Sequence, residues 1–327
     1  MDIPYTRRDF LYRSILATAG LAAGTNAAAS INLDTVSEKP ANFARDADDT
    51  KICIFSKHLQ WLTYQEMAKT AAMLGFDGID LTVRPNGHVE PERVAEDLPK
   101  AVKAVEQAGL KVYMLTTEIT SADQPHTQAI LKTAAKLGIK YYRMGWVKYE
   151  DKQSIEQNLE VFKKMFGQLA ALNKQYQIHG AYQNHAGKNL GSAIWDLWMV
   201  IKDLDPQWLG CQYDIRHAII EGANSWPLGL KLVQSHIRTL DIKDFRWENK
   251  DGKWQIENVP LGEGMVDFTQ YFSLLRSYQI KGPFSLHYEY PLGGADSGAK
   301  SLAIPKEQVL EAMKKDLATL RKWVNKA

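Results

Sequence analysis

The feature that most limits how this chain can fold is an alternation of short apolar runs with longer amphipathic segments, starting at Lys51. Short apolar runs predict buried strands, and apolar residues at three- and four-residue spacing predict helices. The predicted strands cover residues 51–56, 76–83, 111–116, 139–145, 178–182, 208–214, 236–243 and 282–289. Eight strand–helix units predict an α/β protein with one domain, a (β/α)8 TIM barrel.

The predicted helices lie between and after these strands. They cover residues 64–74, 91–108, 125–137, 151–176, 192–204, 227–234, 268–278 and 306–323. Glycines follow the first three, as is typical of helix ends. A doubly wound sheet is the alternative fold, but it would place a glycine-rich phosphate turn after its first strand. The segment Ser56–Leu59 (SKHL) has no glycine, which favours the barrel.

The first fifty residues carry targeting signals rather than strand–helix units. Thr6–Leu11 (TRRDFL) resembles the twin-arginine export motif, Ser14–Ala23 is apolar, and Ala27–Ala29 supplies small residues for cleavage. We expect a signal peptide at 1–29, a linker at 30–50, a barrel at 51–327 and export to the periplasm. An amphipathic helix or an uncleaved anchor are the alternatives. No later segment has the ~18 apolar residues that a membrane span needs.

The composition argues against partners recruited by charge. The formal charge is +2, from 40 basic and 38 acidic residues, so neither nucleic acid nor a membrane surface is an expected partner. Cys53 and Cys211 fall in predicted strands, where buried thiols are expected more than a disulfide. The oligomeric state stays open, with a homodimer as one candidate.

Four predicted strands in the second half of the chain end on metal-binding side chains. The candidate metal ligands are Gln183, Asp214, Asp241 and Glu289. Because the carboxyl ends of barrel strands meet at one mouth, we expect these side chains to converge. Oxygen donors of this kind suit Mn²⁺, Mg²⁺, Co²⁺ or a mixed-ligand Zn²⁺. The residues therefore predict a divalent metal, with an ion pair at Asp214 and a surface position for Glu289 as the alternatives.

Cations and imidazoles follow other strands. The candidate substrate-binding residues are Lys57, His58, His88, Arg143 and His217. Such groups suit hydroxyl and carboxylate recognition, although each can also be structural. The loop Leu261–Gly264 (LGEG) could offer backbone amides to a phosphate, but a simple turn is the favoured interpretation.

From Lys51 onward the chain resembles the sugar isomerase/epimerase superfamily with xylose-isomerase-like barrels. The segments that carry the resemblance are AYQNHAG (181–187), YDIRH (213–217), IKD (242–244), LGEGMVDF (261–268) and Tyr288-Glu289. In ketose epimerases of this group, Glu, Asp, His and Glu at the ends of strands five to eight hold a metal. The two glutamates move protons on opposite faces of the sugar.

Two of those four positions depart from the family pattern. Gln183 replaces the first glutamate and cannot act as a base, and Asp241 replaces the histidine. The first segments and the Lys-Asp pair are also similar to inosose dehydratase, which removes water next to a ketone. The resemblance implies Glu289 as catalytic base, with Lys243, His185 or His217 as acid.

These observations predict an enzyme that abstracts a proton α to a carbonyl of a non-phosphorylated sugar, giving isomerisation or epimerisation. A lyase acting by β-elimination on a keto-sugar or 3-keto-glycoside is one alternative. A catalytically inactive sugar-binding barrel is another, suggested by Gln183 and Asp241. A DNA-repair endonuclease of the same superfamily is disfavoured by the near-neutral charge and the absence of a three-zinc histidine pattern.

Overall fold

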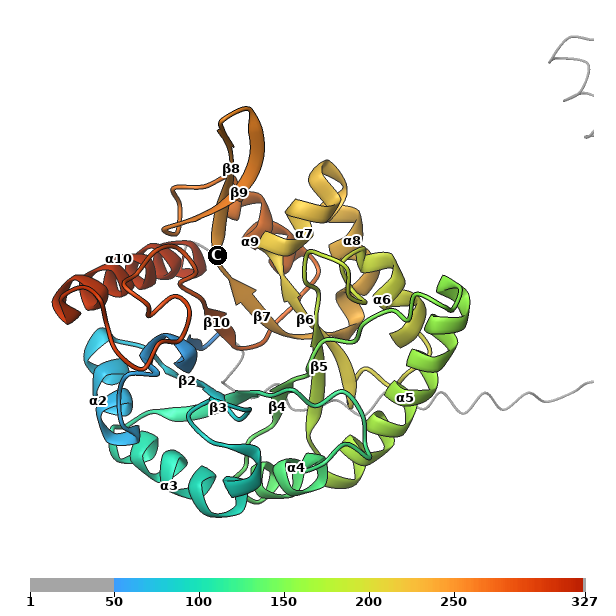
Figure 1. Cartoon of the computed structure of the whole chain (residues 1–327), viewed down its shortest axis with the longest axis horizontal. Coiled ribbons are helices and arrows are strands. Elements are labelled where there is room, and N and C mark those ends of the chain that lie inside the picture. The colour runs from blue at the N-terminus through green and yellow to red at the C-terminus, as the bar shows by residue number, and fades with distance from the viewer. Residues whose placement is uncertain (1–49, 326–327) are drawn as a thin grey trace, which may run out of the picture. The chain divides into compact units, whose positions relative to one another are not determined.

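The structure is a computed structural model that describes residues 50–325 (Figure 1). The predicted signal peptide and nearly all of the predicted linker lie outside these residues, so both stay predictions. The described residues form a single barrel domain. Among them, no helix is long and apolar enough to cross a membrane.

Parallel strands close into a barrel of eight, in the order β1-β10-β7-β6-β5-β4-β3-β2, which confirms the predicted TIM fold. The strands are β1 (Ile52–Phe55), β2 (Gly78–Thr82), β3 (Lys111–Thr116), β4 (Tyr141–Arg143), β5 (His179–Gln183), β6 (Leu209–Asp214), β7 (Ile237–Ile242) and β10 (Phe284–Leu286). Every predicted strand overlaps an observed one. Cys53 and Cys211 are buried thiols in β1 and β6.

Helices surround the barrel on its outside (Figure 1). They are α2 (Tyr64–Leu74), α3 (Val94–Gln107), α4 (Thr127–Lys136), α5 (Ile155–Tyr176), α6 (Ile194–Ile201), α7 (Ile215–Gly222), α8 (Trp226–Val233), α9 (Phe268–Ser277) and α10 (Lys306–Asn325). Thr63 and Ser154 start α2 and α5 with reciprocal capping boxes, and Gly75 ends α2 in the left-handed region, at φ 94°. Their buried apolar faces and the outer face of the sheet make the core.

Two elements were not predicted. Helix α7 begins directly after β6, where Asp214 is its N-cap and accepts a hydrogen bond from the backbone N–H of His217. An antiparallel hairpin, β8 (Asp244–Lys250) and β9 (Lys253–Val259), projects from the end of β7 (Figure 1). Its turn is Asp251-Gly252, with both φ values positive, the two-residue geometry that Asp-Gly favours.

The interior of the barrel beneath its mouth is polar and connected by hydrogen bonds. Thr239 donates to Gln212 (3.0 Å), whose amide nitrogen donates to Asp241 (2.7 Å). On the other side Asp80 accepts from the hydroxyls of Thr116 (2.8 Å) and Ser285 (2.7 Å). All these side chains are fully buried. Because buried polar groups with satisfied partners resist rearrangement, this layer is a rigid floor for the mouth.

Candidate active site

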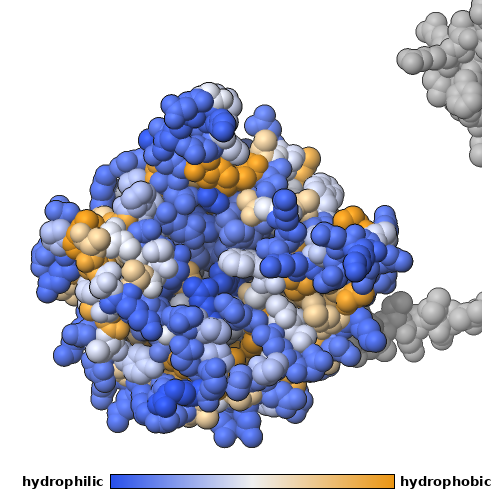
Figure 2. Space-filling view, in the orientation of Figure 1, coloured by the Kyte–Doolittle hydropathy of each residue, from blue (hydrophilic) through white to orange (hydrophobic). Residues whose placement is uncertain are grey.

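The predicted metal ligands and Lys243 come together at the mouth of the barrel. Gln183, Asp214 and Asp241 lie in β5, β6 and β7, while Lys243 and Glu289 follow β7 and β10. This face of the molecule has a hydrophilic recess near its centre (Figure 2). The convergence expected from parallel strand ends is therefore present.

The ammonium group of Lys243 lies between two carboxylates. Its Nζ is 3.0 Å from Oδ2 of Asp214 and 3.2 Å from Oε1 of Glu289. The Lys243 side chain is 3% exposed and that of Glu289 is 24% exposed, so a ligand reaches the pair from the Glu289 side. Burial lowers the pKa of Lys243, but Asp214 and Glu289 outweigh it and the net direction is upward. Lys243 is thus a cation at neutral pH.

The pKa of Glu289 is lowered, whereas that of Lys243 is raised. Burial favours the neutral acid, but Lys243, His287 and Lys57 together hold the pKa of this carboxyl well below its usual range. For Asp214, burial is the larger effect and its pKa is raised despite Lys243. The site therefore pairs an ionised, accessible carboxylate with a protonated amine, which are the states a general base and a general acid require.

Gln183 faces the two other carboxylates through its amide nitrogen. Nε2 donates to Oδ2 of Asp214 (2.8 Å) and to Oδ2 of Asp241 (2.6 Å). Its carbonyl oxygen accepts from Nη1 of Arg143 (2.9 Å), which fixes the amide in this orientation. Asp241 also accepts from Gln212. Gln183 therefore acts as a hydrogen-bond donor between two acids.

This arrangement does not fit a divalent metal. A metal ion needs lone pairs directed at it, whereas Gln183 directs an NH₂ group at both aspartates. The space between Asp214 and Glu289 is crossed by the Lys243 ammonium. Among residues 50–325, no three His, Cys, Asp or Glu side chains are placed to hold an ion. The four predicted ligands are brought together, but the three carboxylates accept from protein donors and Gln183 is one of those donors, so the predicted metal is not supported by their geometry.

His287 belongs to the site and was not among the predicted residues. Its Nε2 lies 3.3 Å from Oδ1 of Asp241 and 3.1 Å from Oγ of Ser285, and its Nδ1 lies 3.7 Å from Oε1 of Glu289. Burial opposes the charged ring, but Asp241 raises the pKa of His287 above its ordinary value. Strand alternation was the available signal, since Ser285, His287 and Glu289 are spaced by two residues.

His185 and His217 form a close pair of rings beside Asp214, with their planes tilted by 39°. Their ring centroids are 3.8 Å apart, and the ring of Trp146 lies 4.5 Å from that of His185. Burial lowers the pKa of His185 to about 4, and it lowers that of His217 as well, so both rings are neutral. Nε2 of His217 is 3.6 Å from Oδ2 of Asp214 and has no hydrogen-bond partner among the described residues. A neutral His185 can accept a proton, but it is a weak acid at pH 7.

The other predicted substrate-binding residues are placed differently from one another. Nζ of Lys57 lies 3.9 Å from Oε1 of Glu289, at the mouth. His58 is fully buried: its Nδ1 bonds the carbonyl of Ala295 (2.9 Å), and its Nε2 accepts from the backbone N–H of Tyr288 (3.0 Å). Both ring nitrogens are thus used within the protein, where His58 positions the segment that carries Glu289, and its contact with a substrate stays a prediction.

His88 lies at the end of β2 rather than in the Lys243 cluster. Its Nδ1 is 3.3 Å from the hydroxyl of Thr82, and burial lowers the pKa of the ring to about 4. No hydrogen bond or ion pair joins it to Lys243 or Glu289, all three residues being within the described chain. The structure therefore does not bring His88 together with the acid–base pair.

The Leu261–Gly264 loop is a turn, as favoured by the sequence. The carboxylate of Asp244 accepts from the backbone N–H groups of Gly262 (2.9 Å), Gly264 (3.0 Å) and Val266 (3.3 Å). An added Cβ at Gly264 would clash with the same carboxylate. Because these amides already bind an internal anion, the loop offers no phosphate cradle.

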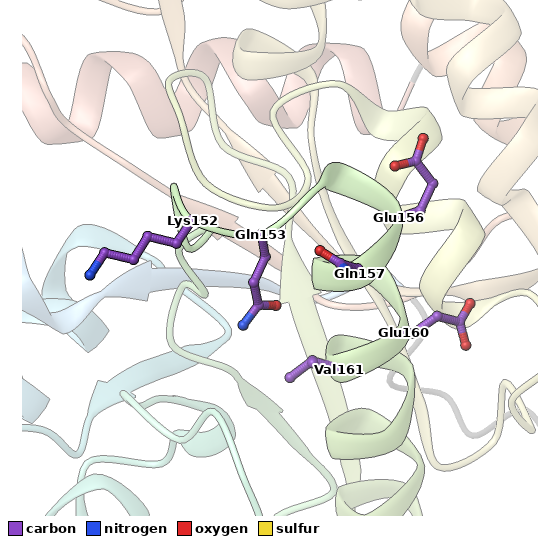
Figure 3. A pocket seen from close by; sticks show the side chains of 6 residues that line it. All are labelled: Lys152, Gln153, Glu156, Gln157, Glu160 and Val161. Atoms are coloured by element: carbon purple, nitrogen blue, oxygen red, sulfur yellow. The ribbon is translucent and has the colours of Figure 1, made fainter.

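A separate hollow lies on the outside of the barrel, at the start of α5 (Figure 3). It is lined by Lys152, Gln153, Glu156, Gln157, Glu160 and Val161, all exposed. No strand end contributes to it, and none of the predicted site residues lines it. It is not a candidate for the chemistry.

Comparisons with known proteins agree with the fold. The chain is 24% identical over 257 residues to a putative L-ribulose-5-phosphate 3-epimerase, SgbU, of Haemophilus influenzae, covering 72% of this chain and 87% of the relative. The structure of 3-keto-D-glucoside 4-epimerase YcjR from E. coli matches with TM-score 0.61 and 15% identity, over 84% of this chain and 99% of that one.

A structure of the IolI protein with a bound zinc atom matches with TM-score 0.65 and 16% identity, over 84% of this chain and 98% of that one. At such identities the two structures show a shared fold. The family model for the xylose isomerase-like TIM barrel matches residues 68–321, which is most of the chain and all of its strands except β1. The chain belongs to the xylose isomerase-like TIM barrel family.

Proposed function

We propose that this chain is an enzyme that abstracts the proton α to the carbonyl of a keto-sugar and so isomerises or epimerises a non-phosphorylated sugar. The observation that carries the proposal is the pair of Glu289 and Lys243, 3.2 Å apart at the mouth of the barrel. The names of the relatives support the epimerisation, since SgbU is described as a putative L-ribulose-5-phosphate 3-epimerase and YcjR as a 3-keto-D-glucoside 4-epimerase; of the two substrates, that of YcjR has no phosphate.

In the proposed reaction the Glu289 carboxylate accepts the proton from the carbon next to the carbonyl. The Lys243 ammonium donates a hydrogen bond to the carbonyl oxygen and stabilises the enediolate that forms. Glu289 then returns the proton to the former carbonyl carbon on the same face, while the hydroxyl proton of the α-carbon passes to the former carbonyl oxygen, which gives isomerisation. For epimerisation, a proton must reach the opposite face. Gln183 cannot exchange one, so the neutral His185 is the candidate to relay a proton from solvent, while Glu289 releases the proton it has taken to solvent. No step is assigned to a metal.

β-Elimination is a second candidate, favoured by the charge state of Lys243. A lyase needs one base and one acid at the leaving oxygen, and a buried cation beside the base can supply that proton. The two reactions share the first proton transfer. Isomerisation or epimerisation gives a product with the composition of the substrate, whereas β-elimination gives a product that has lost one water.

Two features support a non-phosphorylated substrate. The amides of the Leu261–Gly264 loop are used by Asp244, so the loop does not serve a phosphate. The twin-arginine-like motif at Thr6–Leu11 favours a periplasmic enzyme, which we propose as the location, and phosphorylated sugars are uncommon there.

The test is deuterium incorporation followed by NMR in D₂O, with D-fructose, D-allulose, a 3-keto-glucoside and an inosose as substrates. We expect exchange at the carbon α to the carbonyl, reduced about 10²–10⁴-fold in Glu289→Gln, the range for a lost general base. Glu263→Gln, at an exposed carboxylate paired with Lys315, is the matched control. Sugar binding without exchange on any substrate would contradict the proposal and favour an inactive sugar-binding barrel.

A further inference from the structure

We propose that the side of the mouth formed by the ends of β1, β2 and β4 binds a carboxylate group of the substrate. The substrate would then be a keto-sugar acid rather than a neutral sugar. The residues that carry this inference are Lys57, Arg84 and Arg143, which surround the ring of Phe55. The inference rests on the proposed function, because it names the substrate class of the same site.

The three cations converge on one aromatic ring at the end of β1. Nζ of Lys57 and Cζ of Arg84 each lie 5.6 Å from the centroid of the Phe55 ring, and Cζ of Arg143 lies 5.9 Å from it. Cations at this distance interact favourably with a ring face, but one ring does not neutralise three charges. The group therefore has an excess of positive charge.

Two of the three cations have no carboxylate partner. Within residues 50–325, no acid lies within ion-pair distance of the guanidinium of Arg84 or Arg143, and Arg84 donates no side-chain hydrogen bond. Arg143 is 4% exposed and donates to the neutral amide of Gln183, while its Nε is buried without a partner. The nearby buried acid, Asp80, accepts from Thr116 and Ser285 instead.

Lys243, elsewhere at the mouth, is compensated, because it is paired with Asp214 and Glu289. Arg216 has two neutral hydrogen-bond partners, the ring of His217 and Asn258 (2.6 Å). Taking a charge out of water is costly unless an opposite charge or several hydrogen bonds compensate it. Arg84 and Arg143 have no carboxylate at ion-pair distance. Glu118 and Asp80 favour the charged form of Arg84, and Asp241 and Asp80 that of Arg143, but burial still lowers both pKa values, so a ligand can supply the closer anion.

The pKa values of Arg84 and Lys57 agree with an excess of positive charge around Phe55. Burial, followed by the Arg143 charge, lowers the pKa of Arg84 to about 10. Burial also lowers the pKa of Lys57 to about 8, where Glu289 opposes the effect and Lys243, Arg84 and Arg143 add to it. A bound carboxylate would relieve these repulsions, and two guanidinium forks match its planar shape.

The position of the group relative to the acid–base pair orients the substrate. Lys57 is 3.9 Å from Glu289, and Arg143 is hydrogen-bonded to Gln183, so the cations adjoin the reacting pair without being part of it. A sugar acid can place its carbonyl at Lys243 and its terminal carboxylate between Arg84 and Arg143. The carboxylate end therefore positions the α-carbon at Glu289.

The test is isothermal titration calorimetry of the full chain with three ligands that share carbons one to five. These are D-fructose, D-fructuronate and D-fructose 6-phosphate, which end in a hydroxymethyl group, a carboxylate and a phosphate. We expect D-fructuronate to bind at least about tenfold more tightly than D-fructose, the usual effect of one charge-assisted hydrogen bond. Tighter binding of the phosphate than of the carboxylate would overturn the assignment to a sugar acid.

The informative variant is Arg84→Met, and Arg93→Met is its matched control. Arg93 is an exposed arginine paired with Asp97 on α3, so its replacement changes the net charge equally. Arg84→Met should weaken D-fructuronate binding about 10- to 100-fold and leave D-fructose binding within about threefold. Arg84→Lys keeps the charge, so its loss of D-fructuronate affinity should be smaller than that of Arg84→Met. Equal losses for both ligands, or no loss, would overturn the inference.

Deuterium exchange on the same samples separates this inference from the proposed function. Tight D-fructuronate binding without exchange would leave the carboxylate site standing and contradict the enzyme. Exchange into D-fructose as fast as into D-fructuronate, with equal affinities, would leave the enzyme standing and contradict the carboxylate site. Should Arg84→Met fail to fold, the salt dependence of wild-type D-fructuronate binding decides, because an ionic contact weakens with salt and a hydroxyl contact does not.

Discussion

The two sides of the barrel mouth differ in how their charges are balanced. On the side of β5, β6, β7 and β10, each acid has a donor partner, and Lys243 lies between Asp214 and Glu289. On the side of β1, β2 and β4, Arg84 and Arg143 have no partner acid among residues 50–325. The balanced side is prepared for proton transfer without a ligand, whereas the cationic side is complete only when an anion binds.

The largest effect is expected for a substitution of Lys243, on the balanced side of the mouth. Lys243→Met removes the only ion-pair partner that the described chain gives Asp214 apart from His217. We expect a loss of about 3–5 kcal/mol in the free energy of unfolding, as when one partner of a buried pair is removed. Urea denaturation measures it.

Lys243→Met should also reduce deuterium exchange about 10²–10⁴-fold, because the enediolate loses its cation. Lys163→Met, which breaks an exposed pair with Glu160, is the control and should change little. Stability unchanged in Lys243→Met would mean that the Asp214 carboxylate is compensated in another way.

The balanced side can also be changed into a metal site. Gln183→Glu with Asp241→His restores the family's ligand pattern, so we expect this double variant to bind Mn²⁺ at least about tenfold more tightly than the wild type, measured by calorimetry. Exchange by the wild type should stay within about twofold after dialysis against EDTA, since no step is assigned to a metal. Loss of wild-type exchange on EDTA treatment, restored by Mn²⁺, would contradict the reassignment of the predicted ligands.

A pH experiment tests the ionisation of Asp80, the buried acid near the cationic side. Burial raises the pKa of Asp80 from 3.8 to about 6. A folded-state pKa above the unfolded value stabilises the protein below pH 3.8, and the stabilisation is lost as pH rises to about 6, by about 3 kcal/mol. Asp80→Asn should remove this pH dependence, as followed by urea denaturation between pH 4 and 7.5. A wild type that gains stability over that interval relative to Asp80→Asn would show a paired, low-pKa carboxylate instead.

The smallest expected effect is on the stability of Arg84→Met without ligand. Removing a half-buried cation that has no acid partner should leave the free energy of unfolding unchanged or raise it by about 1 kcal/mol. This is opposite in sign to the effect at Lys243, and thermal unfolding of the two variants shows it directly. A clear loss of stability in Arg84→Met would show instead that a protein group compensates the Arg84 charge.

The fold and the convergence of the site followed from local patterns in the sequence. Apolar runs and capping residues marked the strands and helices, and parallel strand ends brought Gln183, Asp214, Asp241 and Glu289 together. The β8–β9 hairpin was missed although Asp251-Gly252 between alternating segments is a strong turn signal. His287 was missed although strand alternation puts it on the same face as Ser285.

Other features depend on contacts that no local pattern contains. His58 bonds the carbonyl of Ala295, 237 residues away along the chain, a contact that its sequence neighbours do not indicate. The direction of the Gln183 amide depends on Arg143 from the neighbouring strand. Charge compensation likewise depends on side chains from several strands of the assembled mouth. For this reason Arg84 was overlooked, and the group of Gln183, Asp214, Asp241 and Glu289 was interpreted as a metal site.

The proposal that one side of the mouth binds the carboxylate and the other transfers the proton is tested most directly by kinetics. The measurement is deuterium exchange into D-fructuronate by Arg84→Met. A residue that only holds the carboxylate should raise KM by at least about tenfold and leave kcat within about threefold. We expect this result. A fall in kcat equal to the fall in kcat/KM would contradict it, because Arg84 would then act in the transition state and the two sides would not be separable.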